Sequence, residues 1–232
     1  MRGATGCVYV GLPEFHDMLF VAHFCDTSVK VADVGANVGV YSILAAQKGA
    51  QVTAMEPVQG AFGCLVRNLL VNGLESSIKA VPQAVGKETG RVRVTSTLGP
   101  TNHVLVAGAS RTDSVDVELK RLDDLIDEAN LIKIDVEGFE SAVLGGAQRV
   151  LHQRSTQAIL LELNGLGRRY GSRDADINEE LVGLGFLPMQ YEPAGRELVE
   201  LPGPNPRGNT LYLKDTLAVA DKLRAAPKVS VL

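Results

Sequence analysis

Tryptophan is absent from the sequence, and aromatic residues make up only 5% of its 232 positions. No long basic run occurs, and the formal net charge is −4. Single-stranded nucleic acids are bound by aromatic stacking in basic grooves, so these absences exclude nucleic acid as the expected partner. No apolar stretch reaches the ~18 residues of a membrane span, and the N-terminus lacks the basic-then-apolar pattern of a signal peptide. We therefore expect no membrane partner.

Cysteine is also scarce. Cys7, Cys25 and Cys64 are odd in number and lack the spacing of metal ligands. They are typical of reduced cysteines in a cytoplasmic protein. Hydrophobic residues form 45% of the chain, enough for one large domain. We expect a helical lead-in over residues 1–29, a main domain over 30–214 and a weakly specified tail over 215–232. The oligomeric state is left open.

The most informative stretch is Val31-Ala-Asp-Val-Gly-Ala-Asn-Val-Gly39. It predicts a buried strand over residues 30–34, a tight turn and a helix from about residue 38. Gly35 and Gly39 bracket the turn, with Ala36 and Asn37 between them, and glycine lets backbone approach a ligand closely. No lysine follows Gly39, which excludes a P-loop, and the glycine spacing does not match the dinucleotide-binding fingerprint.

The pattern Asp-x-Gly-x-x-x-Gly suits a ligand that has an amino-acid end. Asp33 can pair with an ammonium group, and the glycines leave room for a carboxylate and a ribose. S-adenosylmethionine has these parts. Glu56 follows a second predicted strand at the distance expected of a ribose-binding carboxylate. The alternatives are an ordinary βα turn and, for Glu56, an acid that begins a helix before Pro57.

Strands and helices alternate along the chain, which predicts an α/β fold with helices on both faces of a mostly parallel sheet. We expect seven strands, the last antiparallel, and a helix over residues 137–151. Ligands of such sheets bind beyond the carboxyl ends of the strands. The polar residues expected there are Asp33, Glu56, Gln83, Asp135, Glu137, Glu162 and Asn164, beside Ala84. Capping of separate helices by each acid is the alternative.

Four motifs occur in an order that resembles the FkbM family of S-adenosylmethionine-dependent methyltransferases. They are the glycine turn, Met-Glu-Pro, Thr-Asn-His and Ile-Lys-Ile-Asp-Val-Glu-Gly-Phe-Glu, and the resemblance runs from about residue 11 to 213. It implies a Rossmann-like class I methyltransferase fold and O-methylation of a hydroxyl on a sugar or natural product. It places Asp33, Gly35, Asn37, Gly39 and Glu56 at the cofactor and Asp135 near the transferred methyl group.

A hydroxyl is a weak nucleophile, so a base or a cation must activate it. The candidate bases are His103, Asp135 and Glu137. His103 lies in the irregular segment 98–112, which we expect to be mobile and to close over the acceptor. The alternative is Mg²⁺ held by Asp135, Glu162 and Asn164.

Two other functional classes stay open. One is a non-catalytic module that binds adenosylmethionine or a nucleotide. The other is a nicotinamide-dependent oxidoreductase, although its fingerprint needs a third glycine in the turn. The expected partner of a methyltransferase is a small-molecule or saccharide acceptor, and whether oxygen or nitrogen is methylated is undecided.

Overall fold

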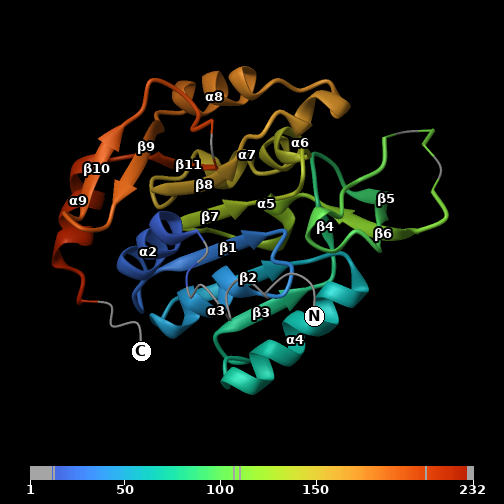
Figure 1. The fold of residues 1–232 in the computed structure, drawn as a ribbon, viewed down its shortest axis with the longest axis horizontal. Helices are drawn as coiled ribbons and strands as arrows, with labels where there is room; N and C mark the ends of the chain where they lie inside the picture. The colour runs from blue at the N-terminus through green and yellow to red at the C-terminus, as the bar shows by residue number, and fades with distance from the viewer. Residues whose placement is uncertain (1–11, 13, 107, 110, 207, 229–232) are drawn as a thin grey trace.

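The computed structural model describes residues 12, 14–106, 108–109, 111–206 and 208–228 (Figure 1). Cys7 lies outside these residues. At its centre is an eight-stranded sheet in the order β10-β9-β11-β8-β7-β1-β2-β3. In chain order the strands are β1 (Lys30–Val34), β2 (Gln51–Met55), β3 (Ile78–Val81), β7 (Leu131–Ile134), β8 (Ala158–Glu162), β9 (Leu187–Glu192), β10 (Glu197–Glu200) and β11 (Asn209–Leu213). From β3 to β8 the pairing is parallel, and β11 runs antiparallel to β8 and β9.

The predicted strand count of seven is wrong by one, because β10 adds an edge strand antiparallel to β9. Its sequence, Glu-Leu-Val-Glu, is short and largely exposed, with Leu198 packed against the core. A strand of this kind has little apolar signal of its own and forms because β9 offers it an unpaired edge.

Helices cover both faces of the sheet. On one face pack α2 (Phe15–Phe24), α3 (Val40–Gln47), α4 (Gln59–Asn72) and α9 (Thr216–Ala225). On the other pack α5 (Leu122–Leu125), α6 (Glu140–Gly145), α7 (Gln148–Leu151) and α8 (Asp174–Gly183). Because successive side chains of a strand point to opposite faces, Val31 belongs to the first core and Ala32 to the second. In the described part of the chain, no helix combines the length and apolar character needed to cross a membrane.

A second, three-stranded sheet consists of β4 (Ala84–Val85), β6 (Ser114–Lys120) and β5 (Gly90–Thr95), in that order. The expected pairing of the two alternating segments is present as the antiparallel pair β5–β6. This sheet lies beyond the carboxyl ends of β1, β2 and β7 (Figure 1). It therefore flanks the edge where ligands of α/β sheets bind.

The helix expected over residues 137–151 is two helices, α6 and α7. Glu137 and Gly138 have φ of 53° and 101°, so a helix begins only at Glu140. At the break, a Cβ on Gly146 would lie 2.0 Å from the carbonyl oxygen of Gly86. This close approach of two backbones leaves no room for a side chain at residue 146 and depends on the tertiary fold.

The tail beyond residue 214 is more ordered than its sequence indicates, since it contains α9. Asp215 caps the helix by accepting a hydrogen bond from the N–H of Ala218, and Val219 and Leu223 are buried. At its other end, the guanidinium of Arg196 donates to the carbonyl oxygens of four residues. These are Leu223, Arg224, Ala226 and Pro227.

Replacing Arg196 by alanine should lower the free energy of unfolding by ~1–3 kcal/mol, because charged hydrogen bonds to the end of α9 are lost. Arg224→Ala is the matched control: Arg224 pairs with Asp221 on the exposed surface, so its loss should cost less than ~0.5 kcal/mol. Urea denaturation of both variants measures the difference. Equal stabilities would show that Arg196 does not hold the end of α9.

Candidate active site

A cavity of about 270 Å³ opens at the carboxyl ends of the parallel strands. Its walls come from the turn after β1, the connection between β2 and α4, the second sheet, residues 99–104 and the connection between β7 and α6. Cavities of roughly 300 Å³ and more typically hold small molecules and cofactors. The described structure thus places a ligand-sized site where the fold class predicts one.

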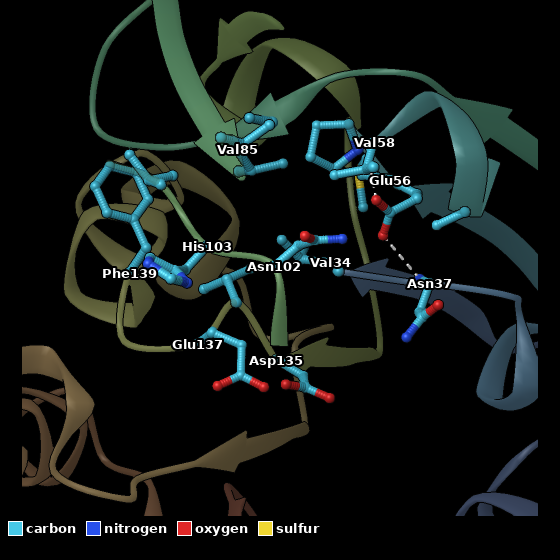
Figure 2. Close-up of a pocket in the computed structure, with 18 of the residues that line it drawn as sticks. Val34, Asn37, Glu56, Val58, Val85, Asn102, His103, Asp135, Glu137 and Phe139 are labelled. Carbon is cyan, nitrogen blue, oxygen red and sulfur yellow. Dashed lines mark hydrogen bonds between the residues drawn. The ribbon is translucent and has the colours of Figure 1, made fainter. Parts of the chain in front are cut away.

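The cavity has an apolar side and an acidic side (Figure 2). Apolar lining residues include Val58, Ala61, Val85, Val94, Val104 and Phe139. Five carboxylates line it: Glu14, Glu56, Asp135, Glu137 and Glu162. Among the residues that the structure describes, no lysine or arginine joins this lining. The site is therefore suited to a ligand that has an apolar part and carries positive charge.

Glu56 lies between the two sides, at the end of β2. Its carboxylate accepts hydrogen bonds from the N–H groups of Val58 at 2.8 Å and Asn37 at 3.0 Å. Burial raises the pKa of Glu56 to about 6, although these two bonds oppose the shift. Each carboxylate oxygen has a further lone pair, so Glu56 can accept two more hydrogen bonds from a ligand in the cavity.

The glycine turn is shaped by the protein's own backbone. The N–H groups of Gly35 and Ala36 both donate to the carbonyl oxygen of Met55 at 3.0 Å, so neither is free for a ligand. A Cβ on Gly35, where φ is +82°, would lie 1.9 Å from the carbonyl oxygen of Asp135. At Gly39 it would meet the Leu65 side chain at 2.5 Å. Gly35 and Asn37 line the cavity, whereas Ala36 and Gly39 do not.

The close contact at Gly35 changes what its substitution should do. The sequence alone predicts that Gly35→Val abolishes cofactor binding in a folded protein. Because the new side chain would strike the backbone carbonyl of Asp135, just after β7, we expect even Gly35→Ala to lower the free energy of unfolding by ~2–4 kcal/mol. Gly63→Ala in α4, with no atom within 4 Å, serves as the control. Equal thermal midpoints for the two variants would contradict this explanation.

Asp33 lies beneath the turn and outside the cavity lining. It is 1% exposed, and Ser42 Oγ donates to its Oδ2 at 2.6 Å. Its Oδ1 lies 4.0 Å from Nζ of Lys133, a buried residue that donates a hydrogen bond to Asp135 Oδ2 at 3.1 Å. Burial raises the pKa of Asp33, opposed by Lys133 and Ser42. The ammonium group beside Asp33 is thus a lysine of β7, a residue that sequence reasoning missed.

Two acids between β7 and the first residue of α6 differ in role. Glu137 lines the cavity, with its carboxylate near that of Asp135 (Figure 2). Burial, followed by repulsion from Asp135 and Glu162, raises the pKa of Glu137 to about 7. Glu140 lies outside the cavity lining and accepts from the N–H groups of Gly138 at 2.9 Å and Val136 at 3.4 Å. Glu140, also missed by sequence reasoning, holds the left-handed connection that presents Glu137.

His103 lines the cavity from the segment that follows β5. Its backbone exchanges hydrogen bonds with Thr95, and its ring Nδ1 lies 3.0 Å from the carbonyl oxygen of Thr101. A carbonyl only accepts, so Nδ1 carries the proton and Nε2 is left as an acceptor. The next residue, Val104, bridges to Val94, and Tyr170 Oη donates to its carbonyl oxygen at 2.6 Å. Residues 102–104 are therefore anchored at the cavity.

The remaining predicted residues divide between lining and surroundings. Gln83 and Ala84 line the cavity, and the amide of Gln83 donates to Glu118 at 2.8 Å. Glu162 also lines it, and burial together with Asp135 raises its pKa. Asn164 does not, and its Oδ1 accepts from the N–H of Leu166 at 3.1 Å. Within the described ranges, no three histidine, cysteine or acidic side chains are grouped to hold a metal, so the alternative Mg²⁺ site is not supported.

Solved structures with the same fold confirm the predicted Rossmann-like α/β class. The methyltransferase FkbM of Methylobacillus flagellatus superposes with a TM-score of 0.52 at 19% identity, over 81% of this chain and 44% of its own. An rRNA methylase of Streptococcus thermophilus also gives 0.52, at 16% identity, over 87% of this chain and 96% of its own.

Curated relatives and a family model agree with this fold. Methyltransferase sdnD of Sordaria araneosa is 31% identical over 153 residues, 50% of this chain and 59% of its own length. Methyltransferase 1 of Beauveria bassiana is likewise 31% identical over 153 residues, 54% of this chain and 61% of its own. The chain thus spans less than two thirds of either relative. The Methyltransferase FkbM domain matches residues 33–188, more than half of the chain, and the chain therefore belongs to the FkbM methyltransferase family.

Proposed function

We propose that the protein transfers a methyl group from S-adenosylmethionine to a hydroxyl of a small molecule or saccharide. The observation that carries this proposal is the composition of the cavity lining. Among the described residues, the lining contains five carboxylates and no lysine or arginine. A sulfonium and an ammonium group fit such a lining. The pyrophosphate of a nicotinamide cofactor would instead be repelled, since anions need cations or free N–H groups.

The residues present fit this cofactor part by part. Val58, Ala61 and Val85 form the apolar side where an adenine ring would be held, and Glu56 would accept hydrogen bonds from ribose hydroxyls. Asp135 and Glu162 lie at the acidic side, which suits the charged methionine end. When bound, S-adenosylmethionine supplies an electrophilic methyl group on its sulfonium.

The chain's own residues must then orient the acceptor and remove its proton. Holding a nucleophile in line with the methyl group can contribute up to ~7–11 kcal/mol. His103 and Glu137 both line the cavity, and His103 Nε2 and the Glu137 carboxylate can each accept a proton. We assign the proton to His103 and the orientation of the hydroxyl to Asp135 and Glu137. A general base contributes ~10²–10⁴-fold to the rate.

Transfer of a radiolabelled methyl group from S-adenosylmethionine to hydroxyl-bearing acceptors tests the proposal. A panel of monosaccharides, glycosides and phenols should contain an acceptor that is labelled by the wild-type protein and not by the heat-denatured one. An ether linkage in the product, identified by mass spectrometry, would establish oxygen as the acceptor atom. Cofactor binding without label on any acceptor would instead favour a non-catalytic binding module, and label on nitrogen would refute O-methylation.

A further inference from the structure

A buried lysine lies inside the apolar strand β7, directly below the cavity. Lys133 is 5% exposed, and its neighbours in the strand are Ile132 and Ile134. The register of β1 against β7 places Asp33 opposite Lys133. Its Nζ lies 3.1 Å from Asp135 Oδ2 and 4.0 Å from Asp33 Oδ1, with the Tyr41 ring centre at 4.9 Å. Lys133 thus lies between two carboxylates, of which only that of Asp135 borders the cavity.

This arrangement is a poor way to gain stability. Taking an ion pair out of water costs several kcal/mol per ion, so well-packed apolar residues are often as stable or more stable at such positions. Asp33 is incompletely satisfied: Oδ2 accepts from Ser42, whereas Oδ1 has no hydrogen-bond partner in the described structure. Of the two ion pairs that the lysine forms, the one to Asp135 is the shorter, at 3.1 Å against 4.0 Å. The charges are therefore better explained by what they do to Asp135 than by stability.

Asp135 is held from two directions. Its backbone carbonyl lies against Gly35, where no Cβ could fit, so the main chain has little freedom. Its side chain is 38% exposed and would be free to rotate without the ammonium group. Lys133 donates one hydrogen bond to Oδ2, so Oδ1 and the second lone pair of Oδ2 can still accept from a ligand.

We propose that Lys133 is a positioning residue, which fixes the Asp135 carboxylate at the cavity while Asp33 holds the ammonium group from behind. Its effect on methyl transfer rests on the proposed function, but its effect on Asp135 does not. In this view the aspartate of the glycine turn acts on the ligand only indirectly, through Lys133 and Asp135.

The test must distinguish the loss of Asp135 positioning from the destabilisation caused by a buried charge without a partner. Lys133→Met alone leaves Asp33 buried beside no cation and is expected to fold poorly. The double variant Asp33→Asn/Lys133→Met removes both charges and should retain the fold by circular dichroism. Lys30→Met is the control. Lys30 lies in the adjacent strand β1 and forms an exposed ion pair with Glu128. The proposal predicts that kcat of the double variant falls ~10²-fold, as for a reacting group misplaced by about 1 Å.

A structural role alone would not produce three further results. The dissociation constant of S-adenosylhomocysteine should rise by a much smaller factor than kcat falls, because Asp135 is only one of the acidic groups at the methionine end. In an Asp135→Ala background, the double change should have little further effect on kcat, because Lys133 acts through Asp135. Crystal structures should show the Asp135 carboxylate turned from its wild-type position, with residues 35–39 unmoved.

Wild-type kcat in the double variant, or an unmoved Asp135 carboxylate, would overturn the proposal. Failure of the proposed function has a different signature, namely that the wild-type protein itself neither binds S-adenosylmethionine nor transfers a methyl group. In that case the position of the Asp135 carboxylate in the two crystal structures alone decides whether Lys133 positions it.

Discussion

Glu56→Ala should weaken binding of S-adenosylmethionine by ~3–6 kcal/mol, since two hydrogen bonds to a charged acceptor are lost at ~1.5–3 kcal/mol each. The carboxylate is 7% exposed and lies between the apolar and acidic sides of the cavity, where a ribose would bridge them. Isothermal titration calorimetry with S-adenosylhomocysteine measures the loss directly, without turnover.

The control for this variant must account for the hydrogen bonds that Glu56 forms within the protein. Its carboxylate also holds the N–H groups of Asn37 and Val58, so alanine leaves two donors unpaired. Glu56→Gln keeps one strong acceptor and should lose less than half of the binding energy. Equal affinities of the wild type and both variants would show that Glu56 supports the turn and does not touch the ligand.

His103→Ala should reduce kcat by ~10²–10⁴-fold and leave the affinity for S-adenosylhomocysteine nearly unchanged. The reason is that His103 lines the cavity and its Nδ1 donates to the carbonyl oxygen of Thr101, so its Nε2 is the ring nitrogen that can accept a proton. A fall in kcat of less than threefold would make His103 a bystander. His152→Ala is the matched control, because His152 is an exposed histidine that bonds through Nδ1 to the carbonyl oxygen of Gln148 and is not among the lining residues.

The pH dependence of kcat/KM distinguishes His103 from the rival base. Glu137 has a pKa raised to about 7 by burial and by the carboxylates of Asp135 and Glu162. A base must be unprotonated, so if Glu137 is the base, kcat/KM rises with pH and levels off above about 7, and Glu137→Gln removes this rise. The proposed role of His103 predicts instead that Glu137→Gln leaves the pH profile unchanged. Loss of the rise in Glu137→Gln would assign the proton to Glu137.

Much of the fold could be predicted from apolar runs and glycines. The five parallel strands, the turn after β1 and the β5–β6 pair follow from local patterns, since each is bounded by residues that end a strand or permit a turn. Strand β10 and helix α9 could not be predicted in this way. Leu198 anchors β10, and Val219 and Leu223 anchor α9; these few apolar residues depend on partners far away in the chain.

The location of the site could be predicted from the sequence, but the contacts between its charged side chains could not. Glu56, Asp135 and Glu137 follow buried strands and line one cavity, as acids at carboxyl ends should. That Asp33 faces Lys133 depends on the register between β1 and β7, which are about 100 residues apart in sequence. A charged residue inside the apolar run Leu-Ile-Lys-Ile was the available signal, because a lysine is rarely buried without a partner.

The charge of the cavity is the central claim, and competition between cofactors tests it most directly. Calorimetric titrations of the wild-type protein with S-adenosylmethionine, S-adenosylhomocysteine and NAD should be made at one pH and ionic strength. The five carboxylates predict measurable binding of both sulfur compounds and no measurable binding of NAD. They also predict that the positive charge of the sulfonium strengthens the binding of S-adenosylmethionine. Binding of NAD with higher affinity than S-adenosylmethionine would contradict the account.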